Sequence, residues 1–236
     1  EQAQVDGRPW NKQAPAPALP AEVVQATAQT TALAAVDVLV NSAGITGPNT
    51  KLWDYPVDAW KQVFDVNVHV VMNGLRAFVP RMLASGGPAH IVNTCSMGGF
   101  LASPMLGAYG ATKFAVRALT ESLQYDLQAR GAKVGVSLLA PGAVKTAIFD
   151  ARAGADADDR VSEGAREMMR QGTAAAGMEP AAIAAEVLAA VREGRYWVFP
   201  HAYMLPAITE NAAGIVACRE PVFDFAKAWK TGGESP

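Results

Sequence analysis

The sequence predicts an α/β protein with a doubly wound parallel sheet and helices on both of its faces. Three short, nearly continuous apolar runs each end abruptly in small residues, Gly or Pro, as strands buried on both faces do. Long segments with helical spacing alternate with these runs, which implies right-handed crossover units between parallel strands. Because ligands bind outside the carboxyl ends of such strands, we expect the three run ends to face one crevice.

Length and composition fit one globular domain over residues 1–236. Half of the 236 residues are apolar and 18% are charged, so the chain can bury one substantial core. The net charge of −2, without a cluster of Lys and Arg, argues against nucleic acid as a partner. The sequence contains no apolar run of membrane-spanning length and no visible secretory leader. Cys95 and Cys218 form no disulfide framework, which suits a cytoplasmic protein.

The first elements are an irregular segment, a helix and a strand. Residues 1–20 are polar and punctuated by prolines, so we expect irregular chain there. A helix is expected over 20–34, because Pro20 is tolerated at a helix start. The first apolar run, VDVLVNSAG, predicts a strand that begins near Val36 and ends at Asn41.

The central elements continue the alternation. Apolar residues at helical spacing predict a long helix over 57–83, and the run HIVNTCSMGG predicts a strand that begins at residue 90. A second long helix is expected over 108–130, with Gly131 in the position of a left-handed helix stop.

The C-terminal third begins with the run VGVSLLAPGAV at 134–144, which predicts another strand. Residues 147–178 are polar, rich in Ala and Gly and weakly patterned, so they form either a mobile flap over the crevice or a disordered insertion. A helix over 180–194 and a last strand over 196–199 complete the pattern.

Several kinds of site are disfavoured by the residues at the strand ends. None of the three histidines has a partner at metal-ligand spacing, so we expect no metal site. Ser96 lies in TCSMG rather than in the G-x-S-x-G turn of a serine hydrolase. Cys95 has no histidine placed to activate it, and a cysteine that ends a buried strand is typically a core residue. Proton chemistry by a phenol remains.

The stretch GAYGATKFAV places Tyr109 and Lys113 four residues apart, on one face of the second long helix. A nearby ammonium favours the phenolate, so Lys113 is expected to lower the pKa of Tyr109 from its usual value near 10. The Ser96 hydroxyl could hold a substrate oxygen near the phenol. Taken alone, the spacing also fits an ordinary contact on a helix surface.

Five ordered motifs between Val36 and Phe199 resemble the short-chain dehydrogenase/reductase family: VDVLVNSAG, DVNVHV, IVNTCS, YGATK and PGAVKT. The resemblance implies a Rossmann-like fold and hydride transfer between an alcohol and a ketone or aldehyde. It implies a catalytic set of Asn67, Ser96, Tyr109 and Lys113. In that set the Tyr passes the proton, the Ser contacts the substrate oxygen, the Lys binds ribose and tunes the phenol, and the Asn holds a relay water.

The resemblance also implies NAD or NADP as the cofactor and a homodimer or homotetramer as the assembly. The implied cofactor contacts are Asn41, Ala43, Gly44, Tyr109, Lys113, Pro141, Gly142, Val144 and Thr146. The sequence does not distinguish NAD from NADP. The residue that contacts the ribose 2′ position follows the second strand of the fold, and no such strand is recognisable in this sequence.

One departure from the family concerns the N-terminal glycine-rich turn that lets backbone amides approach a pyrophosphate. The only glycine before Gly44 is Gly7, so the first strands of the fold are missing from the recognisable pattern. Because the sequence begins with Glu1, we expect that this segment belongs to the natural protein and is absent from this sequence. The alternative is a cofactor-less binding or scaffold protein of the same fold.

Apolar residues near the expected crevice favour a hydrophobic carbonyl compound as substrate. They are Met97, Phe100, Leu101, Met105, Leu106, Ile148, Phe149, Met168 and Met169. Packing in the core or at a subunit interface explains them equally well.

Overall fold

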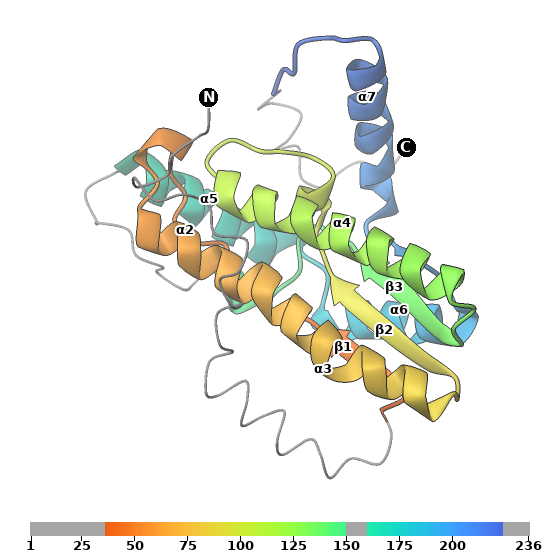
Figure 1. Cartoon of the computed structure of the whole chain (residues 1–236). Helices are drawn as coiled ribbons and strands as arrows, with labels where there is room; N and C mark the ends of the chain where they lie inside the picture. The colour runs from red at the N-terminus through yellow and green to blue at the C-terminus, as the bar shows by residue number, and fades with distance from the viewer. Residues whose placement is uncertain (1–35, 150–159, 224–236) are drawn as a thin grey trace, which may run out of the picture. The chain divides into compact units, whose positions relative to one another are not determined.

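The computed structural model describes residues 36–149 and 160–223 (Figure 1). These residues belong to one compact unit, Ala35–Pro236. The irregular segment and the helix expected over residues 1–34 lie outside the described residues.

The described strands form one parallel sheet in the order β1 (Val38–Asn41), β2 (Ala89–Thr94), β3 (Val134–Leu139) and β4 (Trp197–Val198). The expected parallel sheet is therefore confirmed. Its central strands are buried on both faces, which explains their nearly continuous apolar sequence.

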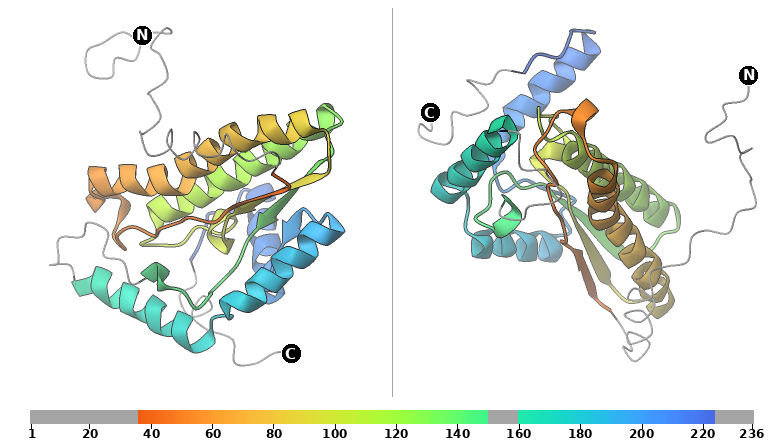
Figure 2. Two further views of the ribbon diagram at one scale, coloured as in Figure 1. Left: turned by 90° about the horizontal axis from the view of Figure 1, so that it is seen from below. Right: turned by 90° about the vertical axis from the view of Figure 1, so that its left-hand side faces the viewer.

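Helices cover both faces of the sheet, as predicted (Figure 2). One face carries α2 (Val57–Phe64), α3 (Val70–Ser85) and α4 (Gly107–Ala129), while α6 (Pro180–Glu193) lies on the other. A cluster of buried side chains fills each side. The α3 and α4 side contains Val71, Leu75, Met82, Ile91, Cys95, Phe100, Val116, Leu127, Val134, Val136, Leu138 and Ala140. The α6 side contains Val92, Leu139, Ile183, Ala190 and Val198.

The helix expected over 57–83 is continuous but not uniform. Between α2 and α3 the chain makes a π-helical turn, Asp65–His69, and Pro80 lies inside α3. The other two long helices end as predicted, since Gly131 and Gly194 both adopt the left-handed conformation, with φ of 63° and 65°.

A ladder of buried amide and hydroxyl groups ties the sheet to α4. Asn41 Nδ2 donates to Asn93 Oδ1 at 2.8 Å, and Asn93 Nδ2 donates to Thr120 Oγ1 at 3.1 Å. The Thr120 hydroxyl in turn donates to the Val116 carbonyl at 2.7 Å. These bonds satisfy polar groups inside the core and thereby fix β1, β2 and α4 relative to one another.

The segment after β3 folds partly as helix. A 3₁₀ turn, η5 (Ala147–Phe149), is followed by α5 (Arg160–Ala176), and Arg166 Nε donates to the Phe149 carbonyl at 2.8 Å. Two long contacts join this segment to the loop after β1: Thr46 to the Ile148 carbonyl at 3.4 Å and Asn49 to Met169 Sδ at 3.4 Å. The described residues of 147–178 thus contact that loop, and the substrate flap expected there stays a prediction.

After β4 the chain makes a 3₁₀ turn, η6 (Ala202–Met204), and a helix, α7 (Leu205–Val216). The sequence pattern predicted no element in this part. None of the helices in the described ranges combines the length and the apolar character that crossing a membrane requires.

Candidate active site

The candidate site lies at the carboxyl ends of β1, β2 and β3. Parallel register places Asn41 beside Asn93 and Thr94 beside Leu139, so the segments that follow the three strands emerge at one edge. This confirms the expectation that the run ends meet. Tyr109 and Lys113 reach the same edge from the first turns of α4.

Ser96 is held in place by the turn that follows β2. Its Oγ accepts a hydrogen bond from the Gly98 amide at 3.1 Å and donates to the Pro141 carbonyl at 3.5 Å. Ser96 Oγ and the Tyr109 ring lie on either side of Gly98, where an added Cβ would be 3.5 Å from the hydroxyl and 3.2 Å from a ring carbon, and the Ser96 side chain acts to lower the pKa of the phenol. The two predicted groups are therefore brought together.

The pKa of the Tyr109 phenol departs from expectation. Burial raises it from 10.0 to about 12, and the Ser96 side chain only partly opposes that rise. Lys113 Nζ lies 5.6 Å from the centre of the Tyr109 ring. The lowering expected from Lys113 is thus wrong for this geometry, because loss of water around the phenol is the larger effect. A phenol that stays neutral at pH 7 is suited to donate a proton.

Lys113 is almost fully buried, with 3% of its surface exposed. Its Nζ donates to the Thr94 carbonyl at 3.1 Å, and burial lowers its pKa from 10.5 to about 8. An ammonium has three N–H donors, so this bond leaves donor capacity for a ligand. Gly44 lies beside this group, since a side-chain carbon there would be 3.4 Å from Nζ, in ordinary van der Waals contact.

Asn67 lies on the π-helical turn and is fully buried. Its amide bridges the loop after β1 to α4: Nδ2 donates to the Ile45 carbonyl at 2.9 Å and to Thr112 Oγ1 at 2.9 Å. Its Oδ1 accepts from the Ile45 amide at 2.9 Å. The side chain therefore supports the site from behind, through the two segments that it joins.

The other predicted contacts differ in position. The Asn41 side chain belongs to the buried ladder rather than to an open surface. Ala43 and Thr146 are exposed, and Val144 pairs with Met178 in an isolated bridge. Pro141 and Gly142 lie directly behind Ser96, as the bond from Ser96 to the Pro141 carbonyl shows.

Two of the apolar candidates for a substrate pocket are core residues. Met97 and Phe100 are 4% and 5% exposed, and Phe100 packs against the guanidinium of Arg117 at 4.4 Å. For these two, packing is the better explanation. Met168 on α5 is 46% exposed and Met169 contacts Asn49, so the flap residues keep both interpretations.

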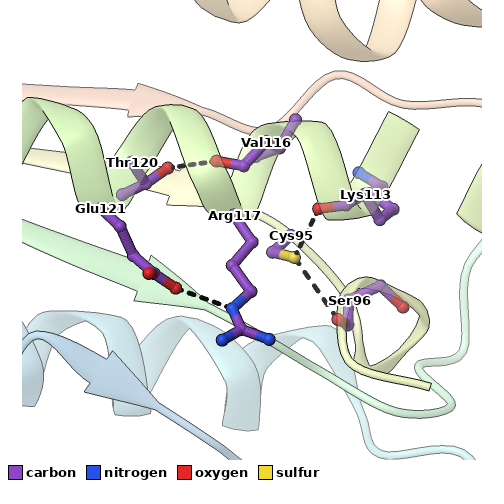
Figure 3. Close-up of polar contacts among 7 residues, drawn as sticks. All are labelled: Cys95, Ser96, Lys113, Val116, Arg117, Thr120 and Glu121. Carbon is purple, nitrogen blue, oxygen red and sulfur yellow. Dashed lines mark hydrogen bonds and ion pairs between the residues drawn. The ribbon is translucent and has the colours of Figure 1, made fainter. Parts of the chain in front are cut away.

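Cys95 is a structural residue beside the site (Figure 3). It is 1% exposed, its Sγ points at the Lys113 and Ser96 carbonyls at 3.2 and 3.4 Å, and burial raises its pKa. A thiol in this state is a poor nucleophile, in line with the expectation from sequence. Cys218 is exposed and unpaired with Cys95. Within the described ranges, no group of three or more His, Cys, Asp or Glu side chains could hold a metal ion.

His201 is the site neighbour that the sequence analysis missed. The imidazole is 3% exposed and hydrogen-bonds both to the Gly142 amide at 3.0 Å and to the Ala143 carbonyl at 2.9 Å. Its position two residues after the strand expected over 196–199 was the one available signal, because strand ends converge at this edge. Metal-ligand spacing, the criterion applied to the histidines, does not detect a residue that binds backbone.

Comparisons with known proteins agree with this fold. The family model for short chain dehydrogenases matches residues 18–156. A crystal structure of a short chain dehydrogenase/reductase from Burkholderia phymatum in complex with NAD superposes with a TM-score of 0.80 and 34% identity, covering 86% of this chain and 74% of that chain. The chain belongs to the short chain dehydrogenase family.

Named relatives are similar over shorter stretches. A 1-deoxy-11-beta-hydroxypentalenate dehydrogenase from Streptomyces exfoliatus is 43% identical over 149 residues, which cover 60% of this chain and 53% of the relative. A C alpha-dehydrogenase from a Sphingobium species is 40% identical over 116 residues, covering 48% of this chain and 36% of the relative. The matched stretches span about half the length or less of these curated relatives.

Proposed function

We propose that the protein is an NAD- or NADP-dependent oxidoreductase that interconverts an alcohol and a ketone or aldehyde. The observation that carries this proposal is the meeting of Ser96, Tyr109 and Lys113 at the carboxyl edge of the sheet. Membership of the short chain dehydrogenase family supports it, as do relatives named as dehydrogenases.

The described residues fit the nicotinamide ribose end of such a nucleotide. Lys113 has N–H donors beyond the one that the Thr94 carbonyl accepts, and Gly44 lies beside its Nζ. Ribose hydroxyls are acceptors of the kind that these donors suit. The complex of the Burkholderia phymatum relative with NAD supports this assignment, whereas the described ranges contain no glycine-rich turn for a pyrophosphate.

The reaction divides between the nucleotide and the chain. When bound, the nicotinamide ring donates or accepts a hydride. Ser96 hydrogen-bonds the substrate oxygen, and Tyr109 gives its phenolic proton to that oxygen during reduction or takes it back during oxidation. Lys113, whose Nζ lies 5.6 Å from the centre of the Tyr109 ring, would hold the ribose beside this phenol. Asn67 fixes the distance between α4 and the loop that follows β1. As the family resemblance implies, it also supports a relay water.

The substrate we propose is a small hydrophobic alcohol or carbonyl compound, because Met169 on α5 contacts Asn49 in the loop after β1 and its neighbour Met168 is exposed. We further propose a homodimer or homotetramer in the cytoplasm. Size-exclusion chromatography with light scattering tests the assembly, and cell fractionation tests the location.

Titration of the full-length protein with NADH and NADPH, followed by nicotinamide fluorescence, tests the proposed function. Tyr109→Phe is expected to lower kcat by about 100-fold or more, because it removes the acid, while nucleotide affinity is retained. Tyr125→Phe is the matched control, since Tyr125 lies on the same helix with 64% of its surface exposed.

Two results would count against the proposal. Turnover by Tyr109→Phe close to that of the wild type would contradict the role of Tyr109. Absence of a response to both nucleotides would favour a cofactor-less binding or scaffold protein.

A further inference from the structure

The His201 side chain holds two consecutive peptide groups of the loop after β3. The Gly142 amide donates to Nδ1 at 3.0 Å, and Nε2 meets the Ala143 carbonyl at 2.9 Å. The ring also packs against the α-carbon of Gly142, where an added Cβ would lie 3.1 Å from two imidazole carbons. One buried side chain therefore fixes this loop by two bonds and a packing contact.

The partners of His201 define its protonation state. A backbone amide can only donate, so Nδ1 must carry a lone pair, and a carbonyl can only accept, so Nε2 must carry the hydrogen. Both bonds form together only in the neutral Nε2–H tautomer. Protonation at Nδ1 would place its N–H opposite the N–H of Gly142. Two donors cannot form a hydrogen bond with each other, so the bond between Gly142 and His201 would be lost.

The loop that His201 holds is attached on its other side to the candidate catalytic groups. The Pro141 carbonyl accepts from the Met97 amide at 2.9 Å and from Ser96 Oγ at 3.5 Å. The Ala143 carbonyl accepts a second bond, from the Met178 amide at 3.0 Å, at the end of the flap segment. A shift of this loop would therefore move both the Ser96 hydroxyl and the base of the flap.

We propose that His201 is a positioning residue, whose neutral imidazole clamps the loop Pro141–Ala143 and through it sets the Ser96 hydroxyl against Tyr109. The clamp itself is a property of the chain alone. Its effect on turnover rests on the proposed function, because only then does the Ser96 hydroxyl meet a substrate oxygen.

The surroundings of His201 favour the neutral form. Burial lowers its pKa below 6.5, and the bond to the Ala143 carbonyl opposes this shift only in part. The Tyr203 ring packs edge-on at 5.9 Å, and Met204 lies across Gly142. The charged groups on the adjoining segments, Lys145 and Glu179, pair with each other at 2.6 Å. The clamp is therefore closed at pH 7 and opens only as the pH falls through this lowered pKa.

Nuclear magnetic resonance of the full-length protein without nucleotide tests the clamp directly. We expect a His201 spectrum of the Nε2–H tautomer at pH 7.5 and slow hydrogen exchange of the Gly142 amide. His201→Ala should speed that exchange about tenfold or more, because the amide loses its acceptor. His201→Asn can still accept from Gly142 through Oδ1 and should restore much of the protection, whereas His201→Gln should not.

His90→Gln is the matched control, because His90 is also a buried histidine but lies near the amino end of β2, bonded to Ser137 at 2.8 Å. It should leave Gly142 exchange unchanged even if it destabilises the fold. An Nδ1–H tautomer, or equal Gly142 exchange in the wild type and His201→Ala, would overturn the clamp.

Turnover separates positioning from simple stability. At pH 7.5, His201→Ala should lower kcat/KM about tenfold or more, with partial rescue in His201→Asn, because misplacing Ser96 weakens its contact with the substrate oxygen. The acid limb of the wild-type pH profile should be absent from His201→Ala. An unchanged kcat/KM and acid limb in His201→Ala would overturn the positioning role. A wild type without nucleotide response would refute the proposed function and the effect on turnover, while the exchange results would still decide the clamp.

Discussion

Burial acts on the two central ionisable side chains of the site in the same sense, toward the uncharged form. It raises the pKa of Tyr109 to about 12 and lowers that of Lys113 to about 8. The phenol therefore keeps its proton at pH 7. The Lys113 ammonium also keeps its proton at pH 7, but its pKa lies only a little above that pH. A ligand that brings acceptors to Lys113 would relieve this cost, so binding and protonation at this residue are coupled.

Lys113→Met should stabilise the protein while it abolishes the proposed activity. A lysine whose folded pKa lies below its unfolded value of 10.5 reduces stability increasingly as the pH falls from 10.5 to about 8. Removing the charge should raise the free energy of unfolding at pH 7 by about 1 kcal/mol, and less at pH 10. Urea unfolding without nucleotide measures both values.

Lys61→Met, at an exposed position of α2, is the control for the substitution at Lys113 and should change stability little. A Lys113→Met protein less stable than the wild type at pH 7 would show that the bond to the Thr94 carbonyl outweighs the cost of burying the ammonium.

At the scale of secondary structure, the π-helical turn between α2 and α3 explains how one amide serves three partners. The turn presents Asn67 to both the backbone of Ile45 and the hydroxyl of Thr112. The side chain bonds to both the amide and the carbonyl of Ile45. It therefore satisfies the backbone of this loop in the way that a neighbouring β-strand satisfies the backbone of its partner.

Asn67→Ala should lower the free energy of unfolding by about 3 kcal/mol, because it leaves buried backbone groups of Ile45 without partners. Urea unfolding of the variant and of Gln62→Ala, an exposed amide on α2, makes the comparison. A loss no larger than that of Gln62→Ala would mean that water replaces the Asn67 amide.

The sequence predicted the elements whose signals are strong. Buried strands and long amphipathic helices were assigned with nearly correct bounds, because apolar periodicity and terminal glycines report them directly. The π-helical turn was missed because one additional residue per turn hardly disturbs that periodicity. The hydrogen bonds of Asn41 and His201 were missed because their partners lie on other strands or in backbone, which spacing along the chain does not reveal.

At the scale of the whole molecule, two buried histidines near opposite ends of the sheet make the free energy of unfolding depend on pH in the acid range. His90 lies between strands with its Nε2 bonded to Ser137, and His201 holds the loop after β3. Burial lowers the pKa of both. A histidine with a depressed folded pKa contributes stability above its unfolded value of about 6.5, and that stability is lost as the pH falls through the folded value.

The free energy of unfolding should therefore decrease by about 1 kcal/mol or more between pH 7.5 and pH 5.5. Urea unfolding at the two pH values measures the change, and a His90→Gln/His201→Asn double variant should show a smaller one. An equal decrease in the double variant would assign the effect to other groups.

The two cysteines differ in exposure, so a thiol-reactive label can be attached selectively to Cys218. Cys95 is enclosed behind Ser96, while Cys218 is exposed just beyond α7, and the sequence contains no third thiol. A maleimide dye can thus be directed to the C-terminal side of α7 in the unmodified chain, far along the sequence from the groups that carry out the proposed chemistry. Such a reporter would follow the region after β4 without any engineered residue.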